Sequence, residues 1–511
     1  MKRNTLLIIL LLLFLSFPAV FPLIHHGFFQ TDDGEWMIIR LSAFYQALRD
    51  GQFPVRFLQR LNFGFGYPVA EFLYPGSFYF ASILHVIRFG FVNAIKLVYG
   101  FSLLGSVFFT YFWLSKLFSK RASVVGAFFA LYIPYHLYDV YKRGTMEVFA
   151  LLWVPFILWQ MERKSIFWVG IGIGLLLVSH NTMALLFLPV LYIYSLLRKL
   201  YPFWRITIIF IFGGLLASFF TIPAVLELHY TVFSQTAVSN PLLYFASLRL
   251  IGYTVLIVLI GTAMSFFLKK KEVSQHSSLA GFFFIISILT VFVNLPLSGF
   301  FWKLPVASFI QFPFRVLSYF VISIAFLAGY LVSFGAKWQQ WTGSVVLILL
   351  LFYFALPYVS PKVYFDKGEG YYYTNDATTT VQDEYMPVWV KKKPVHRPRQ
   401  QVVVTKDAGK VSNIIQTAQS LRFTAQLTKR ANIRVNIIYW PGWHMIVDGR
   451  PAAFSYSNPS GVMMVSLPKG THRVQVLFGE DTIRYIADVL SILSCIGLLI
   501  FTKRYSRNVY A

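Results

Sequence analysis

The sequence predicts a polytopic α-helical membrane protein that carries one small β domain. Of its 511 residues, 57% are hydrophobic and 19% aromatic, whereas only 13% are charged. Soluble domains rarely combine so much apolar surface with so few charges. Apolar runs of roughly 15 to 22 residues, the length that a bilayer requires, recur along most of the chain. The stretch 360–482 interrupts this pattern, because it is polar and contains short alternating segments.

The positions of basic residues indicate how the chain is oriented in the membrane. Clusters such as 269–271 fall between apolar runs, which is typical of cytoplasmic loops. Lys2 and Arg3 place the N-terminus in the cytoplasm, and the basic residues in 503–507 place the C-terminus there too. The run 5–24 lacks a convincing cleavage site, so we expect it to remain as the first helix. The net charge of +25 does not gather with aromatic residues on a soluble face, and no nucleic-acid partner is expected.

We expect about twelve membrane-spanning helices, with a transmembrane domain over 1–359 and a last helix and cytoplasmic tail over 483–511. A long outer segment, 25–92, follows the first helix. The stretch 75–90 within it is ambiguous, and we expect it to re-enter or lie in the interface. If it crossed the bilayer, the basic cluster 116–121 would fall outside. The predicted spans lie near 5–24, 94–115, 122–138, 147–161, 166–179, 183–197, 205–223, 247–268, 279–294, 309–333, 342–359 and 483–502.

Two non-spanning parts of the chain also have a recognisable pattern. The stretch 35–49 has the periodicity of a helix that lies on the membrane surface. Alternating segments within 360–482, separated by turn signals such as Asp448-Gly449, predict a small antiparallel β-sandwich on the extracytoplasmic side. We expect 360–400 to be an irregular linker that leads into it.

An acid pair, Asp32-Asp33, comes directly after the first apolar run. Carboxylates at a membrane surface are costly unless they face water, a metal or a polar ligand. One interpretation is a general base or a pair of metal ligands. The other is a helix N-terminus, with either aspartate as the N-cap and Glu35 in the first turn. The pattern makes the chain look like a membrane enzyme, and it does not distinguish Asp32 from Asp33 as the base.

Charged residues gather again before the predicted span that begins at Glu147. Arg143 lies one helical turn before Glu147, and Asp139 lies one turn before Arg143. Arginine suits a phosphate, and a carboxylate suits a metal, a proton or a sugar hydroxyl. The alternative is a structural ion pair at a helix N-terminus.

Further polar residues lie at predicted outer helix ends. His180 and Asn181 either bind a phosphate or cap a helix. Arg315 lies in an otherwise apolar stretch, so it needs an anion, for which we consider Glu147, Glu227 or a lipid phosphate. The alternative for Arg315 is that its side chain extends to the membrane surface.

Weaker candidates lie in the outer segment. Glu71 and Tyr74 are candidate substrate ligands, and Arg56 is a candidate for lipid head groups. The single cysteine, Cys495, excludes a disulfide framework and a thiolate metal site. We predict no cofactor, although a divalent cation at the acid pair stays open.

At these residues the chain resembles the GT-C superfamily of membrane glycosyltransferases. It resembles more specifically the 6-pyruvoyl-tetrahydropterin synthase-related membrane proteins, which are close to the YfhO-like family. The motifs that carry this resemblance are Pro54-Val55-Arg56-Phe57, Gly64-Phe65-Gly66-Tyr67-Pro68, Tyr74-Pro75, Tyr141-Lys142-Arg143-Gly144-Thr145-Met146-Glu147, Ser179-His180-Asn181, Gln311-Phe312-Pro313-Phe314-Arg315, Tyr439-Trp440-Pro441-Gly442-Trp443 and Val447-Asp448-Gly449.

The resemblance implies a function at the outer face of the membrane. Such enzymes take a sugar from a polyprenyl-phosphate donor, with Asp32 or Asp33 matching the first acid of the superfamily and Asp139 or Glu147 the second. The absence of a Trp-Trp-Asp motif argues against metal-dependent oligosaccharyl transfer. We therefore predict a glycosyltransferase that acts on an envelope or lipid glycan acceptor. The alternatives are a lipid or polysaccharide transporter or flippase, and a non-catalytic envelope assembly protein.

Overall fold

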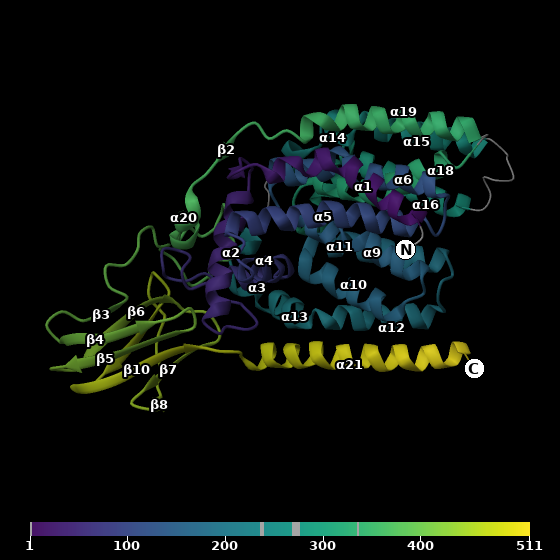
Figure 1. Ribbon diagram of the computed structural model, residues 1–511. Helices are drawn as coiled ribbons and strands as arrows, with labels where there is room; N and C mark the ends of the chain where they lie inside the picture. The colour runs from purple at the N-terminus through teal and green to yellow at the C-terminus, as the bar shows by residue number, and fades with distance from the viewer. Residues whose placement is uncertain (1–2, 236–239, 268–275, 335–336, 511) are drawn as a thin grey trace.

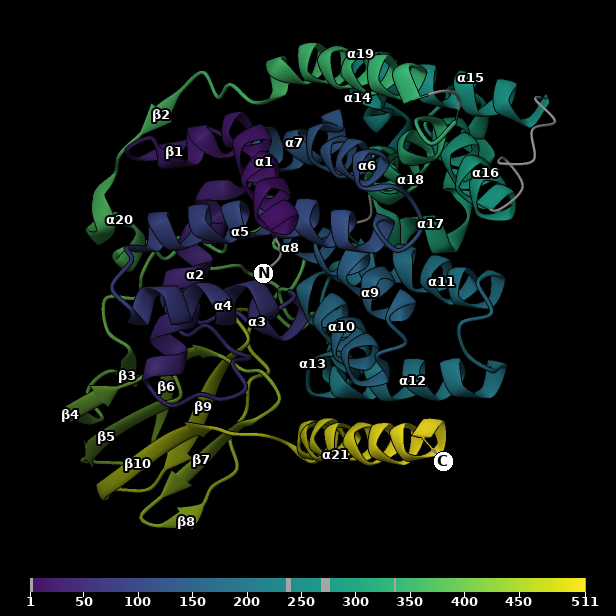
Figure 2. The same cartoon turned by 45° about the vertical axis from the view of Figure 1, so that its right-hand side comes forward.

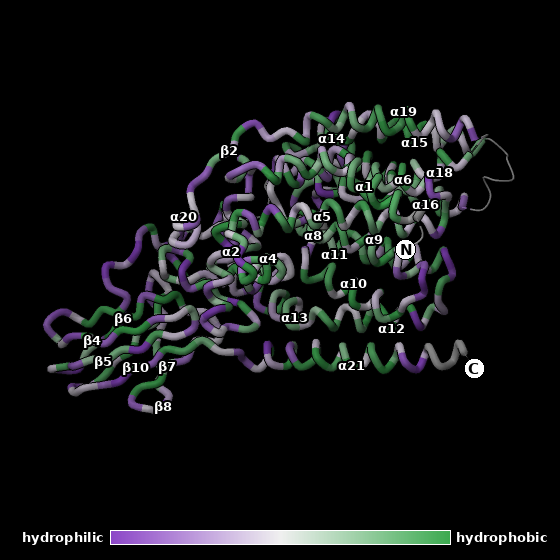
Figure 3. The backbone as a smooth tube through the Cα atoms, in the orientation of Figure 1, coloured by the Kyte–Doolittle hydropathy of each residue, from purple (hydrophilic) through white to green (hydrophobic). Residues whose placement is uncertain are grey.

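Apolar helices and a β-stranded body occupy opposite ends of the computed structural model (Figure 1). The structure describes residues 3–235, 240–267, 276–334 and 337–510. Lys2 and the basic cluster 269–271, which entered the topology prediction, lie outside the described residues. The hydropathy colours change along the same axis, from mostly hydrophobic in the helical body to mixed in the β body (Figure 3).

The helical elements begin and end as follows: α1 (Arg3–Val20), α2 (Gly34–Arg49), α3 (Val69–Phe72), α4 (Gly76–Val86), α5 (Phe91–Leu114), α6 (Lys120–Tyr132), α7 (Pro134–Tyr138), α8 (Glu147–Leu151), α9 (Trp153–Glu162), α10 (Ile166–Ser179), α11 (Asn181–Leu197), α12 (Phe203–Leu216), α13 (Ser218–Glu227), α14 (Leu248–Ile251), α15 (Tyr253–Phe267), α16 (Ser277–Val293), α17 (Pro305–Ile310), α18 (Phe320–Leu331), α19 (Lys337–Ala355), α20 (Gly368–Thr374) and α21 (Thr482–Tyr510). Shorter helical turns include the π-helical η2 (Asp139–Arg143) and the 3-10 segments η7 (Pro296–Lys303) and η8 (Pro313–Tyr319).

Several helices have the length and composition of membrane spans. Within the described residues, 5 helical segments qualify, or up to 7 if two bent pairs each count as one span. The bends are 73° between α12 and α13 and 93° between α16 and η7. These apolar helices support the prediction of a membrane protein, but the predicted number of about twelve spans is not confirmed.

Local sequence explains where some predicted spans break. The span predicted at 122–138 is divided, because Pro134 begins a separate helix, α7, and has no N–H to continue α6. The span predicted at 205–223 is divided at Ala217 between α12 and α13. Helix α4 has only 11 residues, which at about 1.5 Å each is too short to cross a hydrocarbon core of about 30 Å.

Helix α2 occupies the region between the two bodies. It runs across the direction of α5 in both views (Figures 1 and 2). Its bounds match the helix that the periodicity of 35–49 predicts. Met37, Ile38 and Phe44 are buried along it. Its place relative to a bilayer stays a prediction.

The β body consists of two antiparallel sheets that lie one over the other (Figure 2). The larger sheet has the strand order β4-β5-β10-β7-β8 and the smaller β3-β6-β9. Alternate residues of β5 and β6 are buried between them. The strands are β3 (Val402–Val404), β4 (Gly409–Gln416), β5 (Ser420–Leu427), β6 (Ala431–Ile438), β7 (Trp443–Val447), β8 (Arg450–Pro451), β9 (Val462–Leu467) and β10 (Gly470–Phe478).

The β body confirms a β-sheet region within 360–482, whereas its extracytoplasmic location stays a prediction. Asp448 and Gly449 connect β7 to β8, both with positive φ (51° and 79°), as a tight hairpin turn requires. The segment expected to be an irregular linker is partly regular. Its strand β2 (Tyr364–Phe365) pairs with β1 (Phe28–Phe29), just before the acid pair, and α20 packs on α2.

Candidate active site around Glu147

The acid pair is joined to the segment that carries Arg143 by two backbone hydrogen bonds. The Asp32 N–H donates to the Lys142 carbonyl at 2.9 Å, and the Asp33 N–H donates to the Arg143 carbonyl at 2.8 Å. The two clusters that the sequence suggested separately are therefore parts of one site.

The start of α2 leaves the two carboxylates free. Asp33 occupies the N-cap position, but its side chain makes no capping hydrogen bond. The Thr31 hydroxyl accepts the Gly34 N–H instead, at 3.0 Å. Among the residues that the structure describes, neither carboxylate has a hydrogen bond or an ion pair, and Asp32 is exposed while Asp33 is half-buried. The capping interpretation thus accounts for the position of Asp33 and not for its side chain.

Gly144 allows the two segments to approach this closely. Its φ of +68° lies in the left-handed region. A Cβ atom there would come within 2.4 Å of the Thr31 hydroxyl and 2.8 Å of the Gly34 backbone. Tyr99 of α5 fixes the same turn, because its hydroxyl donates to the Gly144 carbonyl at 2.6 Å.

Glu147 is fully buried and lies at the centre of the site. Its Oε2 is 2.8 Å from Arg143 Nη1 and accepts the Tyr135 hydroxyl at 2.7 Å. Its Oε1 accepts from Arg315 Nε at 2.7 Å. A buried carboxylate requires this kind of pairing, because an isolated charge in apolar surroundings costs several kcal/mol. Of the partners considered for Arg315, the structure selects Glu147 and not Glu227.

Asp139 shares Arg143 with Glu147. Its Oδ1 accepts from Arg143 Nη1 at 2.9 Å and from the Thr145 hydroxyl at 2.7 Å, whereas its buried Oδ2 has no partner in the described part of the chain. Burial raises the pKa of Asp139, and repulsion from Glu147 adds to the rise. With both acids charged, the two arginines balance Asp139 and Glu147, and a proton on Asp139 would leave one positive charge in excess.

Both arginines retain a nitrogen that faces no protein acceptor. Arg315 Nη1 donates to the Ile310 carbonyl at 3.2 Å and to Gln311 Oε1 at 2.5 Å, in addition to the contact of its Nε with Glu147. The Nη2 atoms of Arg143 and Arg315 make no hydrogen bond to any described residue. One Nη2 group on each arginine is therefore left for an anionic ligand, while the guanidinium planes lie over Phe314 and Phe312.

His180 lies on another side of Glu147. Its Nε2 is 3.8 Å from Glu147 Oε1, and its buried Nδ1 has no hydrogen-bond partner among the described residues. The Tyr74 ring stacks on the His180 ring with centroids 4.3 Å apart. Asn181 has an architectural contact, since its Nδ2 donates to the Phe72 carbonyl at 3.1 Å.

Tyr74 connects the acid pair with the Glu147 cluster electrostatically. Burial raises the pKa of Tyr74 to about 12, Arg40 opposes the rise, and the Glu147 and Asp33 carboxylates both add to it. Charges from both sides thus act on one phenol. Burial also raises the pKa of Asp32, followed by repulsion from Asp33, while Arg143 and Lys142 lower it.

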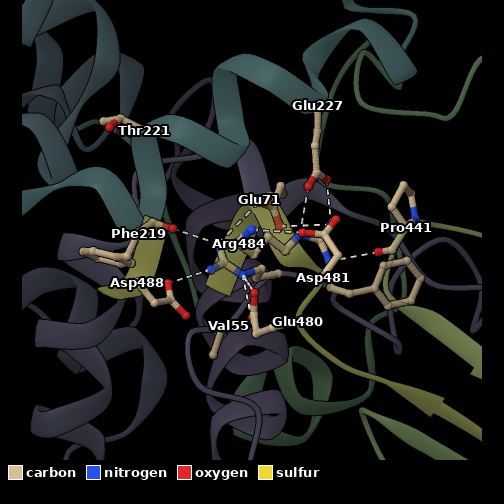
Figure 4. A network of polar contacts seen from close by, with 12 residues as sticks. Val55, Glu71, Phe219, Thr221, Glu227, Pro441, Glu480, Asp481, Arg484 and Asp488 are labelled. Atoms are coloured by element: carbon tan, nitrogen blue, oxygen red, sulfur yellow. Dashed lines mark hydrogen bonds and ion pairs between the residues drawn. The ribbon is translucent and has the colours of Figure 1, made fainter. Parts of the chain in front are cut away.

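Arg56 and Glu71, two of the predicted substrate ligands, belong to a different cluster. Figure 4 shows it around Glu71 and Arg484. Arg56 Nε is 2.7 Å from Glu480 Oε1, its Nη2 is 3.0 Å from Asp488 Oδ1, and its Nη1 is 3.4 Å from Glu71 Oε1. Arg56 Nη1 also donates to the Phe219 carbonyl at 2.8 Å. Every guanidinium nitrogen of Arg56 is therefore occupied by an acceptor of the protein. The sequence had suggested a lipid head group as its partner.

Arg484 completes this second cluster. It contacts Glu227 through Nε at 2.9 Å and Nη2 at 2.6 Å, and it donates from Nη1 to the Pro441 carbonyl at 2.9 Å. Its Nη2 is also 3.7 Å from Glu71 Oε2. The cluster joins the outer segment, α13, α21 and the β body. We therefore interpret its role as holding these parts of the fold together.

Sequence reasoning missed Tyr135 and Arg40, and it included Thr145 in a motif without assigning it a role. Arg40 is 4% exposed and donates to the Thr379 carbonyl at 2.6 Å, and none of the described carboxylates lies within 4.0 Å of it. It follows Asp33 by seven residues, so helical periodicity would have placed both on one face of α2. No sequence signal pointed to Tyr135. Within the described residues, no group of three or more His, Cys, Asp and Glu side chains is placed to hold a metal ion.

Comparisons with known proteins place the fold. No known protein family matches the sequence. The solved structure of the arabinofuranosyltransferase AftD from Mycobacteria is similar, with a TM-score of 0.50, 14% identity, and coverage of 73% of this chain and 28% of that chain. Over the covered part, the chain therefore shares its fold with that structure. ArnT from Cupriavidus metallidurans, bound to undecaprenyl phosphate, gives a TM-score of 0.45 and 14% identity over 66% of this chain and 62% of that chain.

One curated relative is an uncharacterized protein of Lactococcus lactis subsp. cremoris (strain MG1363). It is 25% identical over 200 residues, which make up 37% of this chain and 33% of that protein. The chain thus spans about a third of the relative (33%) and 28% of AftD. The finer resemblance to YfhO-like and 6-pyruvoyl-tetrahydropterin synthase-related proteins stays a prediction.

Replacing Gly144 should separate the acid pair from the Arg143 segment. Gly144→Ala forces a Cβ atom into the Thr31 and Gly34 contacts, and we expect it to lower the free energy of unfolding by roughly 1–3 kcal/mol. Unfolding of purified protein in a detergent titration measures this. The matched control is Gly281→Ala in α16, where a Cβ atom meets nothing within 4 Å. Equal stability of the two variants would contradict the tight approach.

Removing Arg143 should destabilise the protein strongly. Arg143→Gln leaves the buried carboxylates of Asp139 and Glu147 without their shared cation, which we expect to cost about 3–5 kcal/mol. The same titration measures the loss. Arg163→Gln, at an exposed arginine, should change stability by less than about 0.5 kcal/mol. A loss at Arg143 no larger than in this control would show that the cluster does not stabilise the fold.

Proposed function

We propose that the chain is a membrane glycosyltransferase that moves a sugar from a polyprenyl-phosphate donor to a glycan or lipid acceptor of the envelope. The observation that carries this proposal is an acid pair with unpaired carboxylates whose backbone is hydrogen-bonded to the segment of Arg143, next to a cluster in which Arg143 and Arg315 each keep an Nη2 group without a partner among the described residues. The GT-C fold shared with an enzyme described as an arabinofuranosyltransferase is consistent with it.

The donor phosphate would bind at the Nη2 groups of Arg143 and Arg315. Guanidinium N–H groups are strong donors to phosphate oxygens, and two arginines beside each other favour an anion there. His180 adds the unpartnered Nδ1 atom beside the same cluster. Tyr74 would position His180 through the stacking of their rings. Asn181 would hold the neighbouring backbone through its hydrogen bond to the Phe72 carbonyl.

Asp33, or its neighbour Asp32, would act as the general base. As the acceptor hydroxyl oxygen bonds to the anomeric carbon, the carboxylate takes the hydroxyl proton. The bond from the anomeric carbon to the phosphate oxygen breaks, and polyprenyl phosphate leaves with the electron pair. Its charge develops beside the two arginines, so no separate proton donor is needed.

Glu147 has a positioning role in this proposal and does not act as a base. Both of its oxygens are already engaged by Arg143, Tyr135 and Arg315. Asp139 supports Arg143 in the same way. We further propose that the acid pair and the β body face the extracytoplasmic side, with both termini in the cytoplasm, and that Arg56 and Glu71 do not contact substrate.

Neutralising Asp33 should abolish transfer without unfolding the protein. We expect Asp33→Asn to lose at least about 100-fold in rate, the order of a general-base contribution. The assay is transfer from a panel of radiolabelled polyprenyl-phosphate sugars by protein in lipid. The control Glu35→Gln changes a nearby carboxylate that pairs with Lys367, outside the cluster.

Three outcomes separate the functional alternatives. Wild-type transfer by Asp33→Asn would exclude Asp33 as the base. Donor binding without transfer from any donor would favour a flippase. Envelope function retained after neutralising Asp32, Asp33 and Glu147 together would favour a non-catalytic assembly protein.

The pH dependence of transfer should distinguish the two aspartates. Lys142 lowers the pKa of Asp32, which burial and Asp33 raise, so Lys142→Ala should raise the pKa of Asp32 further. A base must be deprotonated, and a higher pKa moves the acidic limb of the rate profile to higher pH. The Lys142 carbonyl that accepts from Asp32 is retained in this variant. An unchanged limb would exclude Asp32 as the base.

A further inference from the structure

An open, shallow pocket lies between the segment before β3 and the loop between β8 and β9 of the β body, remote in sequence from the acid pair. Its volume is about 570 Å³, and its lining includes Trp389, Lys391, Tyr456 and Ser457. Aromatic faces beside a few polar groups are the chemistry that small-ligand sites typically use.

The pocket is held rigidly by backbone contacts between two segments. The N–H groups of Lys391 and Lys392 both donate to the Pro459 carbonyl, at 2.9 and 2.7 Å. Gly461 has a φ of +62°, and a Cβ atom there would come within 2.9 Å of the Trp389 ring. The wall carrying Trp389 is therefore fixed against the loop that carries Tyr456.

Aromatic rings form one side of the pocket and extend beyond it. Trp389 and Tyr456 have ring centroids 5.5 Å apart, and Tyr456 stacks on Tyr439 at 4.1 Å with an angle of 15° between the planes. All three side chains are half-buried. Partly exposed, immobile rings offer apolar faces at a low entropy cost, and a tyrosine hydroxyl adds a polar group at the edge.

The charge beside the rings is positive. Lys391 and Lys392 are exposed, and no described carboxylate lies within 4.0 Å of either ammonium group, whereas Lys393 pairs with Asp383 at 3.1 Å. Lys391 Nζ donates only to the Val388 carbonyl, at 3.1 Å, among the described residues. The region 360–482 as a whole carries sixteen Lys and Arg residues against nine Asp and Glu residues.

We propose that this pocket binds an anionic saccharide, a sugar chain that carries uronic acid or phosphate groups. The rings of Trp389 and Tyr456 would pack against the C–H faces of a sugar ring. The Ser457 hydroxyl would hydrogen-bond to its hydroxyls, and Lys391 would pair with its charged group. Binding involves no bond-breaking step, so the proposal does not depend on the transfer reaction.

Direct binding to the full-length protein in lipid nanodiscs tests the proposal. The probes are soluble oligosaccharides bearing uronic acid or phosphate groups, including tetragalacturonate, with neutral maltotetraose and inorganic tripolyphosphate for comparison. We expect an anionic saccharide to bind more tightly than either comparison probe. Tyr456→Ala and Lys391→Glu should each weaken its binding by about tenfold, equivalent to about 1.4 kcal/mol.

Matched variants make the result specific. Lys406→Glu changes an exposed lysine of the same body outside the pocket, and it should bind as the wild type does. Asp33→Asn should also retain binding, which separates failure of this proposal from failure of the transfer reaction. Unfolding midpoints of all variants identify any that misfold. Because Lys391 is exposed, Lys391→Glu tests the pocket without disturbing the packing of the aromatic rings.

Three results would overturn the proposal. The first is that no anionic saccharide binds the wild type. The second is that tripolyphosphate or maltotetraose binds as tightly as the anionic saccharides. The third is that folded Tyr456→Ala and Lys391→Glu variants bind as the wild type does.

Discussion

The pairing of the buried Glu147 carboxylate with Arg143 and Arg315 is the constraint on which the site depends. The three side chains come from α8, η2 and η8. None of these charges is tolerated alone in apolar surroundings, so each segment is held by the others. Asp139 and the acceptors at Ile310 and Gln311 complete the pairing, and an Nη2 group on each arginine is left without a partner among the described residues.

The position of the acid pair follows from that cluster. Asp32 and Asp33 are held by carbonyls of Lys142 and Arg143, so the backbone that presents Arg143 to Glu147 also sets the distance from the aspartates to the cluster. The left-handed Gly144 ends the π-helical turn and permits the contact. The proposed base and the proposed anion site are thus fixed to one short segment, an arrangement that needs little reorganisation during a reaction.

The parts of the structure that depend on local pattern could be predicted from the sequence. Apolar length located α5, α19 and α21, and periodicity located α2, since these features lie within one continuous stretch. Alternation located the β body for the same reason. The bend of 73° at Ala217 has no comparable signal in the apolar pattern, which runs on through it. The acids of the site were recognised by type, but their partners were not, since Glu147 and Arg315 are 168 residues apart.

Arg56 shows why residue type does not reveal role. It has the same chemistry as Arg143, and the sequence assigned both to substrate. In the structure the acids around Arg56 include Glu480, 424 residues away, and they occupy all of its nitrogens. Arg143 keeps one edge open beside an unpaired aspartate. An arginine that protein acceptors have saturated can only hold the fold together, whereas one with an unfilled edge beside a free carboxylate can bind a substrate anion, and only three-dimensional contacts distinguish the two.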